Sequence, residues 1–478
     1  MISLVINVLA GWLSSLSFAP SLWWITAFVG LSIWHRTIVS ANLRAAMLRS
    51  LVFYLALSFS TIWWTGIYVG VLAPIAISIY QSALFALIPF VVRLFRSNSA
   101  FTYAGLLVMF EWVIRSWPFG GFGWIRFGFT QVNSPLTAFL PFIGVAGLSF
   151  LVAIISFKAK SRLILLVLIT FLLVNLLPNG TKVQANQTLK IALIQGGVSQ
   201  LGFDFNKNPT EVFRRHLAQT ESSIVKNEVD LIIWPENSVD VDLSSHPEIA
   251  RDISDLSTKL NTPILVGEVA NNGTDATSKK LSNQSILFSP NPQKIYIKRY
   301  LTPFGEFIPL RDFFGKFSGY TENVIDFQGG DKAVLFQVKD LNFNSKICYE
   351  LLSDSQNREV ADFSIVQTNN ATFGYTKQLE QQLAIAKIRA IESGRYFAYV
   401  STTGITSVID PNGKVTEFVP KFKAQTLNYE VPKVSGKTIA QRLGFLVEPV
   451  ILILMLLQAL STRTRISWLR RFRILDKK

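Results

Sequence analysis

Long runs of apolar residues limit what this chain can fold into more than any other feature of its sequence. A helix needs roughly 20 apolar residues to cross the hydrocarbon core of a bilayer. Runs of about this length lie near residues 2–18, 20–35, 50–70, 72–92, 99–115, 136–157, 162–178 and 440–460. The sequence therefore predicts an α-helical membrane bundle of about eight spans.

Acidic residues divide the chain into two very different parts. Glu111 is the only acidic residue before Asp204, whereas acids are frequent in the residues that follow. Lipid-facing segments exclude charge, and soluble domains carry it at their surfaces. We predict an N-terminal bundle over 1–178, with about seven spans, and a soluble domain over 179–438. One transmembrane helix at 439–460 and a basic tail at 461–478 complete the chain.

Basic residues indicate how the spans are oriented. The formal net charge is +15, and cations gather in the connections at 36–49, 93–96 and 158–162 and in the C-terminal tail. If the spans alternate, these segments share one side, which the positive-inside rule makes the cytoplasm. The soluble domain is then extracytoplasmic, on the periplasmic side of a bacterial inner membrane. Because topology explains the cations, we expect no nucleic-acid partner.

The segment 112–131 is aromatic, rich in glycine and doubly basic. Two interpretations remain open: an aromatic belt at the membrane interface, or a re-entrant segment that faces phospholipid head groups. The aromatic residues that would line an access route for lipid are Trp117, Phe119, Phe122 and Trp124. Glu111 lies beside this segment and needs a partner, for which Arg115, four residues on, is the nearest candidate.

The soluble domain alternates predicted strands and helices. Strand candidates lie at 190–196, 230–236, 263–269, 284–289, 294–300, 345–350, 362–369, 397–403 and 406–411, with helices at 209–227, 247–260 and 377–393. Nearly continuous apolar strands indicate a sheet that is buried on both faces. About 260 residues suffice for one α/β domain with a large core.

Three predicted strands end in a reactive side chain. Glu236 ends "IIWPE", Lys298 lies late in "IYIKRY", and Cys348, the only cysteine, follows "SKI". Each residue alone has an ordinary structural explanation, such as a solvated carboxylate or a small core side chain. Together they suit covalent catalysis at the strand ends of an α/β fold. A carboxylate can act as general base, a thiol as nucleophile, and an ammonium can stabilise the oxyanion.

The scarcity of cysteine and histidine excludes other kinds of site. The three histidines occur in no motif, which argues against a Cys/His pair and against a metal site. We therefore expect neither a metal nor a cofactor. The stretch "YELLSDSQNREVA" after Cys348 predicts a helix, and a helix N-terminus would favour the thiolate.

The strings "WPE", "YIKRYLTPFGE" and "ICYE" resemble motifs of the nitrilase superfamily. With the predicted spans and the strings "LSFAP", "EWVIR", "GFGW" and "AKIRAIESGR", essentially the whole chain resembles the apolipoprotein N-acyltransferase family, a membrane-embedded branch of that superfamily. The resemblance implies a four-layer α-β-β-α sandwich. It also implies that Glu236 is the general base, Lys298 the oxyanion partner and Cys348 the nucleophile. The supporting residues that it implies are Glu306, Tyr349, Glu350 and Asn369.

The resemblance implies transfer of an acyl chain from a membrane phospholipid through a Cys348 thioester. The acceptor would be the α-amino group of the diacylglyceryl-modified N-terminal cysteine of an apolipoprotein. Two alternatives stay open: a membrane-tethered amidase of the nitrilase type, and a transporter with an extracytoplasmic domain. A transport path needs charges within the spans. Glu111 is the only acid in the bundle and lies near a span end, which weighs against the transporter.

Two positions depart from the family pattern. Asn370 and Thr372, in "NNATFG", stand where the family usually has an acid and a tryptophan. The segment from Gly202 to Asp204 stands where the family usually has a Lys-Trp pair. We expect both positions to contact lipid and therefore to affect the choice of acyl donor.

Overall fold

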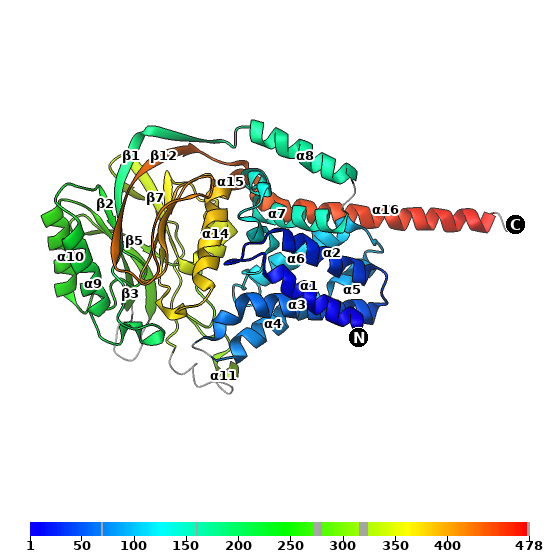
Figure 1. The fold of residues 1–478 in the computed structure, drawn as a ribbon, viewed down its shortest axis with the longest axis horizontal. Helices are drawn as coiled ribbons and strands as arrows, with labels where there is room; N and C mark the ends of the chain where they lie inside the picture. Colours follow the sequence, from blue (N-terminus) through cyan, green and yellow to red (C-terminus); the bar gives the residue numbers. More distant parts are fainter. Residues whose placement is uncertain (68–69, 159–160, 272, 274–279, 315–323, 476–478) are drawn as a thin grey trace. The chain divides into compact units, whose positions relative to one another are not determined.

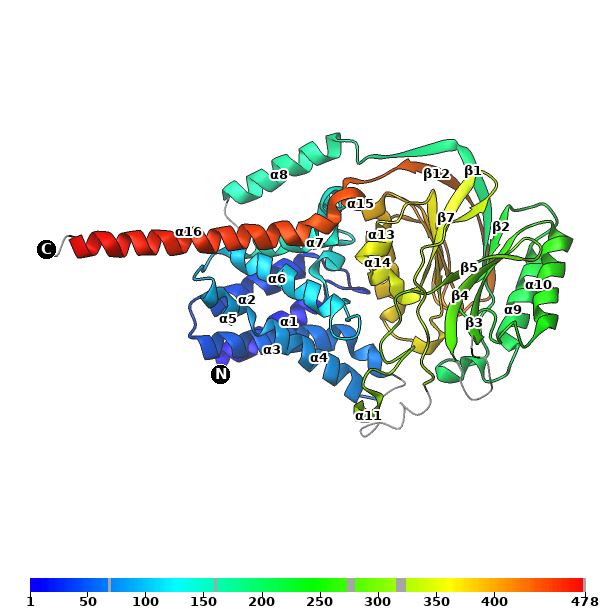
Figure 2. The same cartoon turned by 180° about the vertical axis from the view of Figure 1, so that it is seen from behind.

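The computed structural model describes residues 1–67, 70–158, 161–271, 273, 280–314 and 324–475 (Figures 1 and 2). The basic connection predicted at 158–162 and the basic tail predicted at 461–478 therefore lie partly outside the described residues, at 159–160 and 476–478. The chain divides into two compact units. We call Met1–Pro178 with Arg442–Lys478 the helical unit, and Asn179–Gln441 the sandwich unit.

Helices of apolar residues build the helical unit. They are α1 (Ile2–Ser15), α2 (Ile25–Val39), α3 (Leu43–Ile62), α4 (Leu72–Phe85), α5 (Ile88–Leu94), α6 (Ala100–Ser116), α7 (Leu140–Phe157), α8 (Ser161–Leu176) and α16 (Val447–Leu475). The short α15 (Ile439–Leu443) begins in the sandwich unit and ends in the helical unit. Among the described residues, the segments long and apolar enough to cross a membrane are Leu43–Gly66, Leu72–Leu94, Pro135–Phe157 and Ile439–Ser461. The predicted helical membrane bundle is confirmed, whereas the count of about eight spans stays a prediction.

The predicted partner of Glu111 is wrong. The Glu111 carboxylate accepts a hydrogen bond from the Phe127 backbone N–H at 2.7 Å and lies 3.9 Å from Arg126 Nε. Arg115 instead pairs with Glu448 at the start of α16. A neighbour four residues away on the helix was the simplest expectation, but the chain folds back after α6 and brings Arg126 to the carboxylate.

Two six-stranded sheets form the sandwich unit. The strands are β1 (Thr181–Gln195), β2 (Leu231–Ile233), β3 (Ile264–Asn271), β4 (Leu281–Phe288), β5 (Pro292–Ile297), β6 (Phe336–Val338), β7 (Leu341–Ile347), β8 (Phe363–Thr368), β9 (Phe397–Ser401), β10 (Thr406–Ile409), β11 (Val415–Val419) and β12 (Gln425–Gly436). The first sheet has the order β12-β1-β2-β3-β4-β5 and the second β11-β10-β9-β8-β7-β6. All six residues of β8 are buried, as expected for a strand with parallel neighbours on both sides.

Helices cover the outer face of each sheet (Figure 1). On the first sheet lie α9 (Glu211–Ser223) and α10 (Pro247–Leu260), whose apolar residues share a core with that sheet. On the second lie α13 (Asp354–Asn357) and α14 (Gln378–Ser393), both labelled in Figure 2. The largest core fills the space between the sheets, where Leu193, Leu265, Phe343 and Ile365 are fully buried. The predicted four-layer α-β-β-α sandwich is confirmed.

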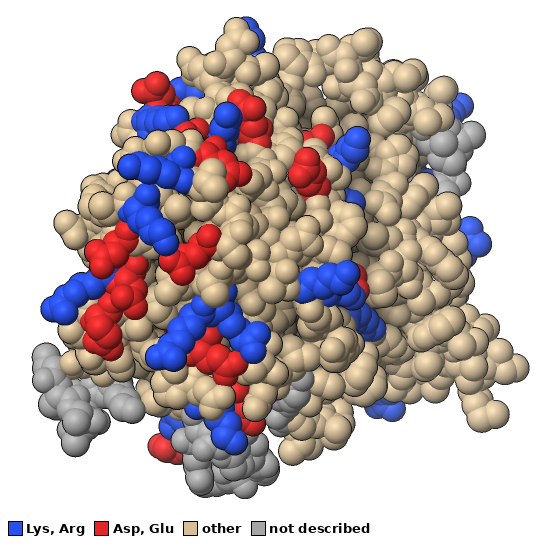
Figure 3. All heavy atoms as spheres, turned by 60° about the vertical axis from the view of Figure 1, so that its left-hand side comes forward, with Lys and Arg blue, Asp and Glu red and all other residues tan. Residues whose placement is uncertain are grey.

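The surface over α9 and α10 carries charges of both signs. Figure 3 brings this face forward and shows cations and anions interspersed on it. Glu211 pairs with Arg215 within α9, and Glu221 of α9 pairs with Lys259 of α10. This balanced, solvated surface contrasts with the helical unit, whose sequence contains few acids.

Candidate active site

The three predicted reactive side chains meet at the carboxyl ends of strands from both sheets. Glu236 follows β2 by three residues, Lys298 directly follows β5, and Cys348 directly follows β7. Lys298 Nζ lies 3.6 Å from Glu236 Oε1 and donates a hydrogen bond to Glu306 Oε1 at 2.8 Å. The charges of Glu236 and Lys298 both act on the Cys348 thiol. A carboxylate, an ammonium and a thiol therefore lie close together at this end of the two sheets.

Glu236 is held by amides on both sides of its carboxylate. Oε1 accepts a hydrogen bond from Asn283 Nδ2 at 2.6 Å, and Oε2 accepts one from the Asn369 backbone N–H at 2.7 Å. Asn283 also donates to Glu306 at 3.1 Å, so one amide joins both carboxylates. Gly267 of β3 permits this packing, because a Cβ there would lie 2.8 Å from the Glu236 Cα.

Burial and neighbouring charges set the protonation of this cluster. Burial raises the pKa of Glu236 above its ordinary value, and the charge of Glu306 adds to the rise, whereas Lys298 opposes it. Burial alone would lower the pKa of Lys298, but the carboxylates of Glu306 and Glu236 outweigh it and raise that pKa. Lys298 therefore stays an ammonium at neutral pH beside a carboxylate of increased basicity.

The thiol of Cys348 is protonated at neutral pH, contrary to expectation. Burial, followed by the charge of Glu236, raises its pKa to about 12. The predicted helix after it is only a 3-10 turn, Cys348–Leu352, followed by the four-residue α13. So short an element provides little dipole to favour a thiolate. The charges of two carboxylates, Glu236 and then Glu306, act on this thiol.

A left-handed backbone conformation aims the Cys348 side chain. Its φ is 51°, a region that costs a non-glycine residue energy and that is found at functional sites. Glu350 holds this bend, since its carboxylate accepts hydrogen bonds from the Ile347 N–H at 2.8 Å and the Arg299 N–H at 2.8 Å. The predicted supporting residue Glu350 thus ties the turn after β7 to the residue that follows Lys298. Tyr349 is half-buried beside Lys298, whose charge acts on its hydroxyl.

Gln382 of α14 is a contact of the sulfur that the sequence did not reveal. Its Nε2 lies 3.4 Å from Cys348 Sγ as hydrogen-bond donor. Its Oε1 accepts hydrogen bonds from Tyr399 Oη at 2.9 Å and from Asn370 Nδ2 at 2.8 Å, among others. Because these donors fix the oxygen, the amide N–H is directed at the sulfur.

Polar side chains also join the two sheets beneath the site. Gln367 of β8 donates to the Trp234 carbonyl oxygen at 2.7 Å and accepts from Ser285 of β4 and Ser345 of β7. These side chains are buried in an otherwise apolar interior. Such fully paired polar contacts are sensitive to geometry, so they fix how the strand ends of one sheet face those of the other.

Two family models match the chain. The apolipoprotein N-acyltransferase N-terminal domain matches residues 10–157, and the carbon-nitrogen hydrolase domain matches residues 190–440. The chain belongs to the carbon-nitrogen hydrolase family. Glu236, Lys298 and Cys348 all lie within the part that matches this family. The motifs indicated a resemblance to apolipoprotein N-acyltransferases. The match of residues 10–157 to the N-terminal domain of that family confirms it.

Curated relatives of this carbon-nitrogen hydrolase family member extend over nearly its whole length. An apolipoprotein N-acyltransferase of Haemophilus ducreyi is 28% identical over 483 residues, covering 93% of this chain and 94% of that protein. One of Mycolicibacterium smegmatis is 29% identical over 485 residues, covering 92% of this chain and 81% of that protein. A solved CN-hydrolase superfamily protein of Xanthomonas campestris has a TM-score of 0.39 and 16% identity, covering 56% of this chain and 97% of that one.

The positions that depart from the family pattern lie together, and one does not contact lipid. Asn370 is fully buried, and its Oδ1 accepts a hydrogen bond from Ser401 at 2.7 Å while its Nδ2 donates to Gln382. The Gly202 N–H donates to the Ala371 carbonyl oxygen at 2.8 Å, beside Thr372. Asn370 therefore acts on the sulfur through Gln382, and our expectation that it contacts lipid is wrong.

The four aromatic residues predicted to line a lipid route differ in exposure. Trp117 and Phe119 are 60% and 38% exposed. Trp124 is buried against Trp64, with ring centroids 4.9 Å apart, and Phe122 stacks on it at 5.8 Å. Of the four, Trp117 and Phe119 are best placed to contact lipid directly, and the role of all four stays a prediction.

Proposed function

We propose that the protein transfers an acyl chain from a membrane phospholipid to the α-amino group of the lipid-modified N-terminal cysteine of apolipoproteins. The observation that carries the proposal is that both family models match this one chain. In addition, curated apolipoprotein N-acyltransferases align with more than nine-tenths of its length. The N-terminal match favours acyl transfer over the amidase alternative, since hydrolysis of a small amide needs no membrane bundle.

In the first half-reaction, Glu236 takes the proton of the Cys348 thiol, and the sulfur attacks the ester carbonyl of the phospholipid. The Lys298 ammonium stabilises the oxyanion of the tetrahedral intermediate. The C–O bond then breaks, and the proton held by Glu236 passes to the leaving alkoxide. A lysophospholipid departs, and the acyl chain remains on Cys348 as a thioester.

In the second half-reaction, the free α-amino group attacks the thioester carbonyl. Glu236 takes a proton from the nitrogen, the C–S bond breaks, and the sulfur regains a proton. The products are an amide and the free thiol. A thioester is activated toward amines, so the cycle needs no nucleotide, which suits an extracytoplasmic site on the periplasmic side of the inner membrane.

The test is acceptor dependence in proteoliposomes that contain phospholipid with a labelled acyl chain. A synthetic peptide with a diacylglyceryl-modified N-terminal cysteine serves as acceptor, and the same peptide with an acetylated α-amine is the control. We expect label in an amide on the first peptide and none on the second. Labelled free fatty acid as the main product with the first peptide present would show a hydrolase.

The rate of acyl-enzyme formation should depend on pH through Glu236. The base works only when ionised, so the single-turnover rate without acceptor should rise with pH through a pKa above the usual carboxylate value, because burial raises the pKa of Glu236. No further rise is expected near the ordinary cysteine pKa of about 8.5, because the thiol pKa is about 12. A rate that follows a single inflection near a free thiol's pKa would contradict Glu236 as the base.

Gln382→Leu should slow acyl-enzyme formation by about tenfold to a hundredfold, the range for losing a hydrogen bond to a charged group. The matched control is Gln378→Leu on the same helix. Gln378 donates to Gln382 Oε1 at 3.2 Å and accepts a hydrogen bond from Asn370 at 2.9 Å, so its side chain bonds within the described structure to these amides and not to the sulfur. We expect a clearly smaller loss in the control. Equal losses in both variants would mean that the network matters only for packing.

A further inference from the structure

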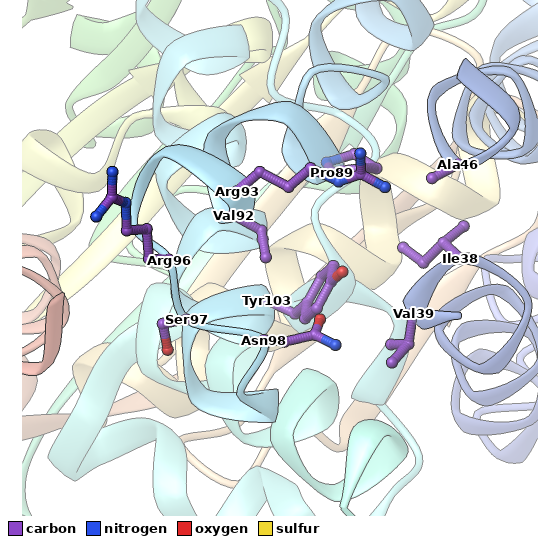
Figure 4. A pocket seen from close by; sticks show the side chains of 10 residues that line it. All are labelled: Ile38, Val39, Ala46, Pro89, Val92, Arg93, Arg96, Ser97, Asn98 and Tyr103. Atoms are coloured by element: carbon purple, nitrogen blue, oxygen red, sulfur yellow. The ribbon is translucent and has the colours of Figure 1, made fainter. Parts of the chain in front are cut away.

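A cavity lies within the helical unit, and none of the residues of the proposed reaction lines it. It has a volume of about 310 Å³ and is bounded by residues of α2, α3 and α5 and by the start of α6. Figure 4 shows Tyr103 near the middle of the view, with Arg93 above it and Ile38 to one side, all three lining the cavity. Arg96 lies at the edge of the same view and also lines the cavity. We call it the arginine pocket.

The arginine pocket contains hydrogen-bond donors that the protein leaves unused. Tyr103 is only 3% exposed, yet its hydroxyl makes no hydrogen bond with any residue that the structure describes. The Arg93 guanidinium, which has five N–H donors, donates to the Ala41 carbonyl oxygen at 3.0 Å. Arg93 and Tyr103 both line the cavity, as Figure 4 shows. The Tyr103 hydroxyl and the Arg93 guanidinium therefore both have donors that a ligand in the cavity could use.

The helical unit provides no carboxylate for these cations within its described part. Its sequence has three acids, Glu111, Glu448 and Asp476. Glu111 faces Arg126 and Glu448 pairs with Arg115, while Asp476 lies outside the described residues. Arg93 and Arg96 are both exposed, so an anion from another molecule can reach them.

The walls of the arginine pocket indicate what kind of molecule this is. Ile38, Pro89 and Val92 form an apolar wall beside the cations. On the same helix as Arg93, Phe90 and Leu94 are 42% and 55% exposed, so the outer face next to the pocket is apolar. A ligand with a phosphate and hydrocarbon chains satisfies both surfaces, and basic pockets between membrane helices bind anionic lipid head groups.

We propose that the arginine pocket binds the phosphate of an anionic phospholipid. Arg93 and the Tyr103 hydroxyl donate hydrogen bonds to the phosphate oxygens, and Arg96 adds a second positive charge. The apolar wall receives the first carbons of the lipid chains. A head group with its own ammonium partly neutralises the phosphate, so the pocket prefers phosphatidylglycerol to phosphatidylethanolamine. The site uses none of Glu236, Lys298 and Cys348, and its existence is independent of the proposed acyl transfer.

The test is native mass spectrometry of the full-length protein in neutral detergent, titrated separately with phosphatidylglycerol, phosphatidylethanolamine and inorganic phosphate. The pocket variant is Arg93→Gln with Arg96→Gln. Its matched control is Arg36→Gln with Arg44→Gln, which removes the same charge from two exposed cations that do not line the pocket. Tyr103→Phe removes only the hydroxyl and tests the site without a change in charge.

We expect one phosphatidylglycerol to bind at least about tenfold more tightly than phosphatidylethanolamine, with the pocket variant losing about tenfold in affinity. Tyr103→Phe should lose affinity measurably, and the control should keep that of the wild type. Equal losses in the pocket variant and the control would overturn the proposal, because binding would then follow overall charge. Full displacement of the lipid by inorganic phosphate would overturn the assignment to a lipid.

Discussion

Replacing Cys348 by alanine is expected to reduce acyl transfer by at least about a thousandfold, because the account makes its sulfur the only atom that carries the acyl chain. Folding should be little affected. The side chain is half-buried, and its sulfur accepts a long hydrogen bond from Gln382 at 3.4 Å. The measurement is kcat/KM for transfer to the lipopeptide, with a thermal melt of the same preparation.

Cys348→Ser distinguishes nucleophilic from structural roles of this residue. Serine keeps the size and one hydrogen-bonding atom, but its hydroxyl is a much weaker nucleophile at the same site. We expect a melting temperature like that of the wild type and a loss of transfer close to that of the alanine variant. Substantial transfer by either variant would show that the acyl chain does not pass through residue 348.

Replacing Lys298 by methionine is expected to cost both activity and stability. Activity should fall about a hundredfold to a thousandfold, the usual effect of removing one group that stabilises an oxyanion. Stability should fall by about 3–5 kcal/mol, because Glu236 and Glu306 would remain as buried carboxylates without their cation. Steady-state kinetics and denaturant unfolding in detergent measure the two effects separately.

The double variant Lys298→Met with Glu306→Gln separates catalysis from folding. Glutamine at 306 removes one of the two carboxylates, and its amide can still accept the hydrogen bond from Asn283. We expect much of the lost stability to return while acyl transfer stays low. If transfer returned together with stability, Lys298 would be a structural residue and the oxyanion partner would have to be sought elsewhere.

The α/β architecture of the sandwich unit was predictable because its most buried strands and helices have the clearest patterns of apolar residues in the sequence. The strand predicted at 362–369 is β8 (Phe363–Thr368), and the helix predicted at 377–393 is α14 (Gln378–Ser393). The missed strands, β6, β11 and β12, all lie at sheet edges, whereas the fourth edge strand, β5, was predicted at 294–300. β12 (Gln425–Gly436) pairs along most of β1 but alternates buried and exposed residues, and several are polar. An edge strand with one solvated face has no continuous apolar run to mark it.

The site was predictable at the residues whose chemistry is unusual for their position. An acid, a lysine and a lone cysteine at strand ends stand out in the sequence, and the structure brings them together. Asn283 and Gln382 did not stand out, because a buried amide is recognised only by what it touches. The string "LSNQS" gave the one available signal, since consecutive polar residues interrupt an otherwise apolar strand.

The state of the thiol could not be predicted from local sequence. A helix after Cys348 was expected to lower its pKa, but only a short turn forms there, and burial and the charge of Glu236 raise the pKa. Burial is a property of the whole fold, and here it outweighs the local dipole. The same reason explains Asn370, which looked like a surface departure in sequence and is fully buried two hydrogen bonds from the sulfur.

The most direct test of the central claim is to trap the acyl chain on the protein. Wild-type protein is incubated without acceptor in vesicles of phospholipid with a labelled acyl chain, then digested and mapped by mass spectrometry. The account predicts one acyl chain on the peptide that contains Cys348, released by neutral hydroxylamine as expected for a thioester, and none on Cys348→Ala. An unlabelled wild-type peptide, or label at any other residue, would contradict it.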